Sequence, residues 1–131
     1  MADTFKFELV SPERLLISED VEQVVVPGSE GDFAILPGHA PILSTLRPGV
    51  LDVSSSESGD KSIFVRGGFA EGGPESLTVL AQEAIAVEDL TAEDVSRQIS
   101  EAEEALAREN ITDEERRYNE TALQALRDLK K

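Results

Sequence analysis

The sequence predicts a β-sandwich followed by two helices, and three observations support this fold class. Up to residue 87, short runs rich in Val, Ile, Leu, Phe and Thr alternate with Gly, Pro, Ser and Asp about every ten residues, which is typical of a sandwich or barrel. After Glu88 there are no further Gly or Pro residues, and the apolar period lengthens from two to about three and a half. We therefore expect a β-sandwich domain over residues 1–87 and an antiparallel two-helix hairpin over residues 88–131.

Ten strand-like runs make up the predicted sandwich. They begin near Phe5, Arg14, Val21, Phe33, Ile42, Gly49, Lys61, Gly68, Leu77 and Ala84. Residues 54–60 separate two of these runs and consist of serine, glutamate, glycine and aspartate. Because this segment has too little apolar surface to be buried, we expect it to form an exposed hairpin tip.

Two capping signals divide the C-terminal region into two helices. Thr91 followed by Asp94 predicts one helix start, and Thr112 followed by Glu115 predicts another, with Asn110 as a left-handed terminator between them. The apolar stripes are Val95, Ile99, Ala102 and Leu106 on the first helix and Tyr118, Ala122, Ala125, Leu126 and Leu129 on the second. Alanine buries little apolar area, at roughly 25 cal/mol per Å². The hairpin should therefore be marginally stable alone and need to dock on the β domain or on a partner.

Composition argues against several classes of function. The net charge of −15 disfavours binding to nucleic acid, which is held by Lys and Arg on its phosphates, and it equally disfavours an anionic membrane surface. The chain has no cysteine and a single histidine, His39, so it cannot assemble a zinc site from thiolates or imidazoles. No apolar run approaches the roughly 20 residues that a membrane-spanning helix needs.

No motif in the sequence predicts an active site. The glycines from Gly67 to Gly72 have the spacing of a phosphate loop, but Gly73 and Pro74 occupy the places of the required Lys and Ser or Thr. His39 lies in a turn between two prolines, where a structural or interface role is commoner than general-base catalysis. We therefore expect no catalytic residue, no metal and no tightly held cofactor.

The charges are unevenly distributed along the chain. Residues 112–131 carry five acidic and five basic side chains, whereas acidic residues predominate in the rest of the chain. The basic residues of this segment are Arg116, Arg117, Arg127, Lys130 and Lys131. They form either a solvated helix face with i,i+4 ion pairs or a contact for an acidic partner, and the sequence leaves both interpretations open.

The most informative stretch is residues 27–50, which reads PGSEGDFAILPGHAPILSTLRPGV. It is preceded by FELVSP at residues 7–12 and followed by GGFAE at residues 67–71 and LTVLAQEAI at residues 77–85. In order and spacing these segments resemble the epsilon subunit of the F-type proton-translocating ATP synthase, whose mitochondrial counterpart is called delta. The resemblance covers most of residues 5–90.

The resemblance implies a mechanical function. Family members are non-catalytic subunits of the central stalk that link the gamma subunit to the membrane c-ring and turn with both, which couples proton transport to ATP synthesis. By motif position, Glu30, Gly31 and Asp32 correspond to the part that faces the c-ring. Ser11 and the turn around His39 correspond to positions on the side that faces gamma.

The resemblance also implies a regulatory function for the helices. In several bacterial members the hairpin opens and its basic second helix contacts the catalytic beta and alpha subunits, which inhibits ATP hydrolysis. Arg116, Arg117 and Arg127 are the candidates for that contact here. Some relatives bind ATP through an Ile- or Leu-Asp-x-x-Arg-Ala motif, of which residues 112–117 keep only Asp113 and Arg116.

Two other hypotheses remain open from the sequence alone. One is a free-standing acidic β-sandwich adaptor that binds a partner through the hairpin, and the other is a small nucleotide-sensing protein that uses Asp113 and Arg116. The first residues have the features of neither a signal peptide nor an Arg-rich transit peptide. Together with the resemblance, this predicts a peripheral location at the cytoplasmic face of a bacterial inner membrane.

Overall fold

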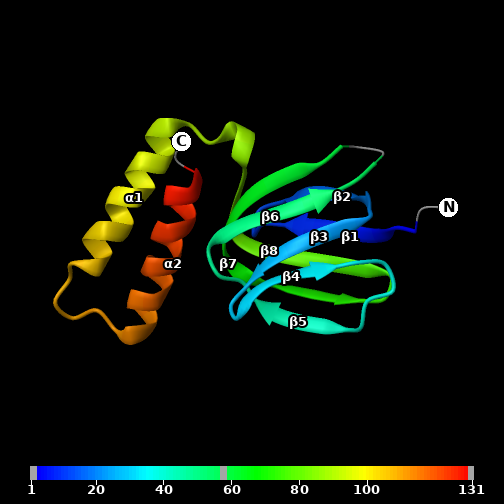
Figure 1. The fold of residues 1–131 in the computed structure, drawn as a ribbon, viewed down its shortest axis with the longest axis horizontal. Coiled ribbons are helices and arrows are strands. Elements are labelled where there is room, and N and C mark those ends of the chain that lie inside the picture. The colour runs from blue at the N-terminus through cyan, green and yellow to red at the C-terminus, as the bar shows by residue number, and fades with distance from the viewer. Residues whose placement is uncertain (1–2, 57–58, 130–131) are drawn as a thin grey trace.

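The computed structural model describes residues 3–56 and 59–129, which form a two-layered β-sandwich followed by two packed helices (Figure 1). The strands are β1 (Phe5–Val10), β2 (Leu15–Val21), β3 (Gln23–Gly28), β4 (Gly31–Ile35), β5 (Ile42–Thr45), β6 (Gly49–Ser54), β7 (Lys61–Gly73) and β8 (Ser76–Ala86). A 3-10 turn, η1 (Val87–Asp89), leads into α1 (Ala92–Leu106) and α2 (Asp113–Leu129). The division into domains between residues 87 and 88 stays a prediction.

Strands β7 and β8 each contribute to both layers of the sandwich. The strand order is β2-β1-β8-β7-β6-β3-β4, with β5 pairing to β7. The first half of β7 pairs with β6 and the second half pairs with β5, while the first half of β8 lies parallel to β1. Except for the β1–β8 pair, the strand pairs of the described residues are antiparallel.

The prediction of ten separate strands was wrong in number, because the described chain forms eight. The runs that begin near Lys61 and Gly68 belong to one strand, β7, which is paired with β8 from Ile63 to Arg66 and again from Gly68 to Gly73. Gly67 and Gly68 have φ values of 70° and 108°, which allow β7 to bend while it keeps the same register with β8. The runs near Leu77 and Ala84 are likewise continuous in β8.

The core of the sandwich comes from the alternation that the sequence predicts. On β1 the inward residues Phe5, Phe7 and Leu9 are 2%, 0% and 1% exposed, whereas their neighbours are not buried. Most of the other buried core residues are aliphatic side chains of β3, β6, β7 and β8. The segment between β6 and β7 is not wholly exposed as predicted: Ser55 is buried, and residues 57 and 58 lie outside the described part.

Both predicted helix starts are confirmed. Thr91 and Asp94 exchange hydrogen bonds in a capping box, and Thr112 and Glu115 do the same at α2. The predicted left-handed terminator at Asn110 was wrong: α1 ends at Leu106, its C-cap is right-handed, and no described non-glycine residue has a positive φ. The stripes are confirmed at Val95, Ala102, Ala122 and Leu126, which are buried, whereas Tyr118 is 38% exposed.

Candidate functional site

The two helices dock on the sandwich through a second, smaller core. Phe64 on β7, Val95 on α1 and Leu126 on α2 are 2%, 5% and 0% exposed and form one cluster. Partly buried apolar side chains pack against it: Val50, Val87, Leu90, Ile99, Ala125 and Leu129. The hairpin is therefore held against the face of the sandwich that carries β6 and the first half of β7.

Arg66 on β7 reaches from the sandwich to both helices. Its Nη1 donates a hydrogen bond of 3.0 Å to Gln98 Oε1 on α1, and its guanidinium carbon lies 5.7 Å from the centre of the Tyr118 ring on α2. Its Nε lies 3.9 Å from Glu83 Oε2 on β8. The Arg66 side chain is only 17% exposed, so the docked hairpin covers most of it.

The turn between β3 and β4 carries the acidic residues of the most informative stretch. The Arg47 guanidinium pairs with Asp32 and donates a hydrogen bond of 2.7 Å to the Gly28 carbonyl. Ser29 adds a backbone hydrogen bond of 2.9 Å to the Thr45 carbonyl. Glu30 is exposed and makes no ion pair within the described residues. The turn thus has a fixed shape and presents one unpaired carboxylate.

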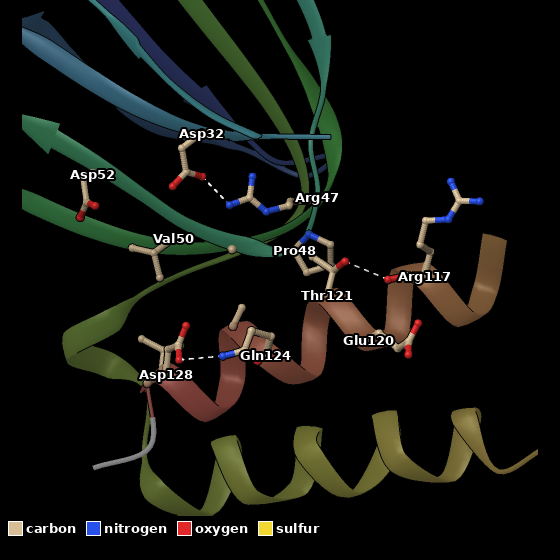
Figure 2. A pocket seen from close by; sticks show the side chains of 13 residues that line it. Asp32, Arg47, Pro48, Val50, Asp52, Arg117, Glu120, Thr121, Gln124 and Asp128 are labelled. Atoms are coloured by element: carbon tan, nitrogen blue, oxygen red, sulfur yellow. Dashed lines mark hydrogen bonds and ion pairs between the residues drawn. The ribbon is translucent and has the colours of Figure 1, made fainter. Parts of the chain in front are cut away.

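A groove of about 590 Å³ separates this turn from α2 (Figure 2). Asp32, Arg47 and Asp52 line it from the sandwich, and Arg117, Gln124 and Asp128 line it from α2. Gln124 donates a hydrogen bond of 3.0 Å to Asp128 along the helix. Charges of both signs therefore face the groove from two elements.

The outer face of one layer carries a row of apolar side chains that sequence reasoning missed. The register places Leu15 beside Val10, Val10 beside Leu80, and Leu80 beside Phe69, so these four residues share one face across four strands. Leu15, Leu80 and Phe69 are 53%, 37% and 36% exposed. Leu43 on the adjoining β5 lies on the same face and is 72% exposed. We call Leu15, Val10, Leu80, Phe69 and Leu43 the apolar row.

The apolar row and the acidic turn adjoin each other. An open hollow of about 660 Å³ is lined by Ser29 and Glu30 of the turn and by Leu43, Ser44, Thr45, Phe69 and Glu71 of β5 and β7. The signal for this face was present in the sequence as the alternate positions of each strand. Sequence analysis missed this face because single exposed apolar residues are common on protein surfaces. Only the strand register shows that several of them adjoin.

Comparison with known proteins decides the family. Residues 4–87 match the family described as "ATP synthase, Delta/Epsilon chain, beta-sandwich domain". The ATP synthase epsilon chain of Mesorhizobium japonicum is 50% identical over 107 residues, which cover 82% of this chain and 79% of that relative. This chain belongs to the ATP synthase delta/epsilon family. The epsilon chain of Maricaulis maris is 48% identical over 128 residues, covering 95% of this chain and 92% of its own.

A solved structure has the same fold over nearly all of this chain. A chain in the central stalk and c-ring of Tetrahymena thermophila mitochondrial ATP synthase matches with a TM-score of 0.69 and 13% identity, covering 98% of each chain. At that identity the likeness concerns the fold alone. The family membership makes this chain a non-catalytic subunit of ATP synthase, and it leaves no support for a free-standing adaptor protein.

Ser11 and His39, which are predicted to face gamma, lie at opposite ends of β1 in this chain. Ser11 follows the end of the strand, where its hydroxyl donates a hydrogen bond of 3.3 Å to the Arg14 carbonyl. The His39 ring packs edge-on against Phe5 at the strand's start, with ring centres 5.7 Å apart, and its Nδ1 lies 3.0 Å from the Ala40 carbonyl. The structure therefore gives both residues local roles and does not bring them together.

The predicted residues of the hairpin are scattered over α2. Arg117 lines the groove, whereas Arg127 pairs with Glu103 on α1 at 3.4 Å. Asp113 and Arg116 are exposed in the first turn of α2, and neither lines the groove. The structure thus brings Arg117 and Asp32 to the same groove, whereas Asp113 and Arg116 lie away from it, and their part in binding ATP stays a prediction.

Neither a cluster of metal-ligating side chains nor a membrane-spanning helix occurs in the described residues, 3–56 and 59–129. Within these ranges no group of three or more Asp, Glu or His side chains is arranged to hold a metal ion. No described helix is both long enough and apolar enough to cross a bilayer.

Proposed function

We propose that this chain is a rotor subunit of the central stalk, where it links the gamma subunit to the c-ring and couples proton transport to ATP synthesis. The observation that carries the proposal is the pair of adjoining exposed surfaces on the sandwich, one apolar and one acidic. A linker between two partners needs two such surfaces on a stiff body, and a close-packed two-layered core is stiff. The related chain in the Tetrahymena central stalk and c-ring structure has the same fold.

The apolar row is the proposed surface for gamma. Exposed apolar side chains that adjoin across several strands mark protein contacts in soluble proteins. Ser11 follows Val10 in the chain, so it lies at the border of the row. His39 packs over Phe5 at the other end of β1 and so lies at the margin of the same layer. Both candidates then serve at the edge of the interface, while Leu43, Leu80 and Phe69 supply its apolar centre.

The acidic turn is the proposed surface for the c-ring. Gly31 has a φ of 137°, a conformation that favours glycine, so it sets the direction of the turn. Asp32 is engaged by Arg47 and acts as a support, which leaves Glu30 as the carboxylate available to a basic group of the ring. The contact should therefore weaken as salt screens the exposed charge.

The hairpin is the proposed regulatory element. Its docking core is small: among the described residues the buried members of this cluster are Phe64, Val95 and Leu126, so its release exposes little apolar surface. In the released state the arginines at positions 116, 117 and 127 are free to contact acidic segments of the catalytic alpha and beta subunits and so inhibit ATP hydrolysis. The subunit then resides peripherally at the cytoplasmic face of a bacterial inner membrane, as part of the assembled synthase.

Titration of ATP hydrolysis tests the regulatory part. The purified catalytic complex with its own gamma subunit is titrated with the full chain and with a form that ends after Leu90. We expect both forms to bind and only the full chain to inhibit. Equal hydrolysis with both forms would remove the regulatory function from the helices. Because Asp113 and Arg116 are exposed and do not line the groove, we expect isothermal titration of the chain with ATP to give no heat.

A further inference from the structure

One side chain, that of Arg66, connects three elements across the contact between the sandwich and the hairpin. It projects from β7, contacts Gln98 on α1 and Tyr118 on α2, and lies near Glu83 on β8. The second core beside it is made of apolar contacts, which have no directional preference. Directional contacts to both helices come from Arg66.

We propose that Arg66 is the positioning residue that fixes the helical hairpin on the sandwich by holding both helices at once. The inference deepens the proposed regulatory function and rests on it only for the consequence in the assembled synthase. The contact itself is a property of the isolated chain and is tested there.

The chemistry of the contact requires arginine. The planar guanidinium donates an in-plane hydrogen bond to Gln98 and lies over the face of the Tyr118 ring at 5.7 Å. Lysine would offer a point charge without a flat face. Because α1 supplies Gln98 and α2 supplies Tyr118, the two contacts form together only when both helices are docked in this position.

The contact is also incomplete, which keeps it reversible. Arg66 Nε is buried and has no hydrogen-bond partner among the described residues, and the nearest carboxylate oxygen, on Glu83, is 3.9 Å away. A buried unpaired donor opposes docking, and water satisfies it when the hairpin leaves. Arg66 therefore fixes the docked position while it leaves the docked state only moderately favoured.

The test measures hairpin position in the full chain. The sequence has no cysteine, so Glu75→Cys on the sandwich and Glu104→Cys on α1, both exposed positions, can carry a pair of spin labels. In this background Arg66→Met keeps the apolar stem and removes the guanidinium. We expect the fraction of molecules whose hairpin has left the sandwich, which we call the open fraction, to rise about tenfold. A charged hydrogen bond and a cation–π contact are both lost in this variant.

A matched control separates positioning from a general loss of charge. Arg97→Met removes an arginine of α1 that is 64% exposed and, within residues 3–56 and 59–129, pairs only with Asp94 in its own helix. We expect it to leave the label distances unchanged. The urea midpoint of the sandwich should also stay unchanged in both variants, whereas a merely structural role for Arg66 would lower it.

Two variants on the helices keep the proposal testable if Arg66→Met folds poorly. Gln98→Ala and Tyr118→Leu should each raise the open fraction by a smaller factor, and neither should add to the effect of Arg66→Met. Unchanged label distances in Arg66→Met, or fully additive effects, would overturn the proposal. If the open fraction rises but ATP hydrolysis by the synthase does not change, the contact stands and the proposed regulation fails.

Discussion

Arg47 pairs with Asp32 and thereby ties the turn between β3 and β4 to the segment that precedes β6. The same guanidinium donates to the Gly28 carbonyl at 2.7 Å, so two positions of the turn are held by one side chain. The Asp32 side chain is 60% exposed, so the pair contributes little to global stability. Its effect is local: it fixes the direction in which Glu30 is presented.

Replacing Arg47 should loosen the turn without unfolding the protein. Arg47→Met is expected to cost at most about 1 kcal/mol of global stability, because the pair is solvent-exposed. The amides of residues 28–32 should exchange with deuterium faster, as measured by NMR. Arg14→Met is the control, since Arg14 is exposed and makes no ion pair in residues 3–56 and 59–129. Unchanged exchange at residues 28–32 would contradict the account of the turn.

Replacing Gly68 should destabilise the sandwich. A Cβ at this position would lie 1.8 Å from the Leu80 carbonyl oxygen, and φ is 108°. The strained backbone alone is expected to lower the free energy of unfolding of Gly68→Ala by about 1–3 kcal/mol, and the clash lowers it further. Urea unfolding measures the loss. Gly73→Ala is the matched control at the end of the same strand, because a Cβ there meets nothing within 4 Å. Equal midpoints for the two variants would show that the bend in β7 does not need glycine.

Truncating Leu126 should release the hairpin and leave the sandwich folded. This side chain is 0% exposed between α2 and the sandwich, so Leu126→Ala is expected to cost roughly 2–5 kcal/mol of docking and helix stability. Hydrogen exchange should accelerate in α1 and α2 but not in β1, β7 or β8. Gln124→Ala serves as the control, because Gln124 is an exposed residue of the same helix that lines the groove and is not part of the second core. A common loss of protection in helices and strands would mean that the two parts unfold as one unit.

Placing a charge in the apolar row should weaken binding to gamma. Leu43 is 72% exposed, so Leu43→Asp should leave the unfolding midpoint nearly unchanged. A charge buried in an apolar interface costs several kcal/mol, so the dissociation constant for gamma should rise at least about tenfold by titration calorimetry. Ile85→Asp is the control, since Ile85 is 36% exposed and lies beside Phe64 on the side of the sandwich that faces the hairpin, away from the row. Equal affinity of both variants would exclude the row from the interface.

Local signals in the sequence predicted the fold well. The capping boxes at Thr91 and Thr112 and the alternation in β1 depend only on neighbouring residues, and all are confirmed. The count of strands failed at Gly67 and Gly68, because a glycine pair ends a strand in one context and bends it in another. Leu123, which is buried at 9% exposure, lies beside the predicted stripe of α2 and was missed.

The candidate surfaces depended on long-range pairing and so were predicted less well. The apolar row needs the register of β1, β2, β7 and β8, which no single segment specifies. Arg66 gave no sequence signal, because its partners Gln98 and Tyr118 are distant in the chain. Motif position supplied Glu30 and Asp32, but only the structure distinguishes the exposed carboxylate from the one that Arg47 engages.

In the proposed function the sandwich joins the rotor through gamma. The most direct measurement is binding of the full chain to the purified catalytic complex, prepared with and without its gamma subunit, by analytical ultracentrifugation. We expect one copy bound per complex when gamma is present and no binding when gamma is absent. Binding that does not depend on gamma, or no binding to either complex, would exclude gamma as the point of attachment.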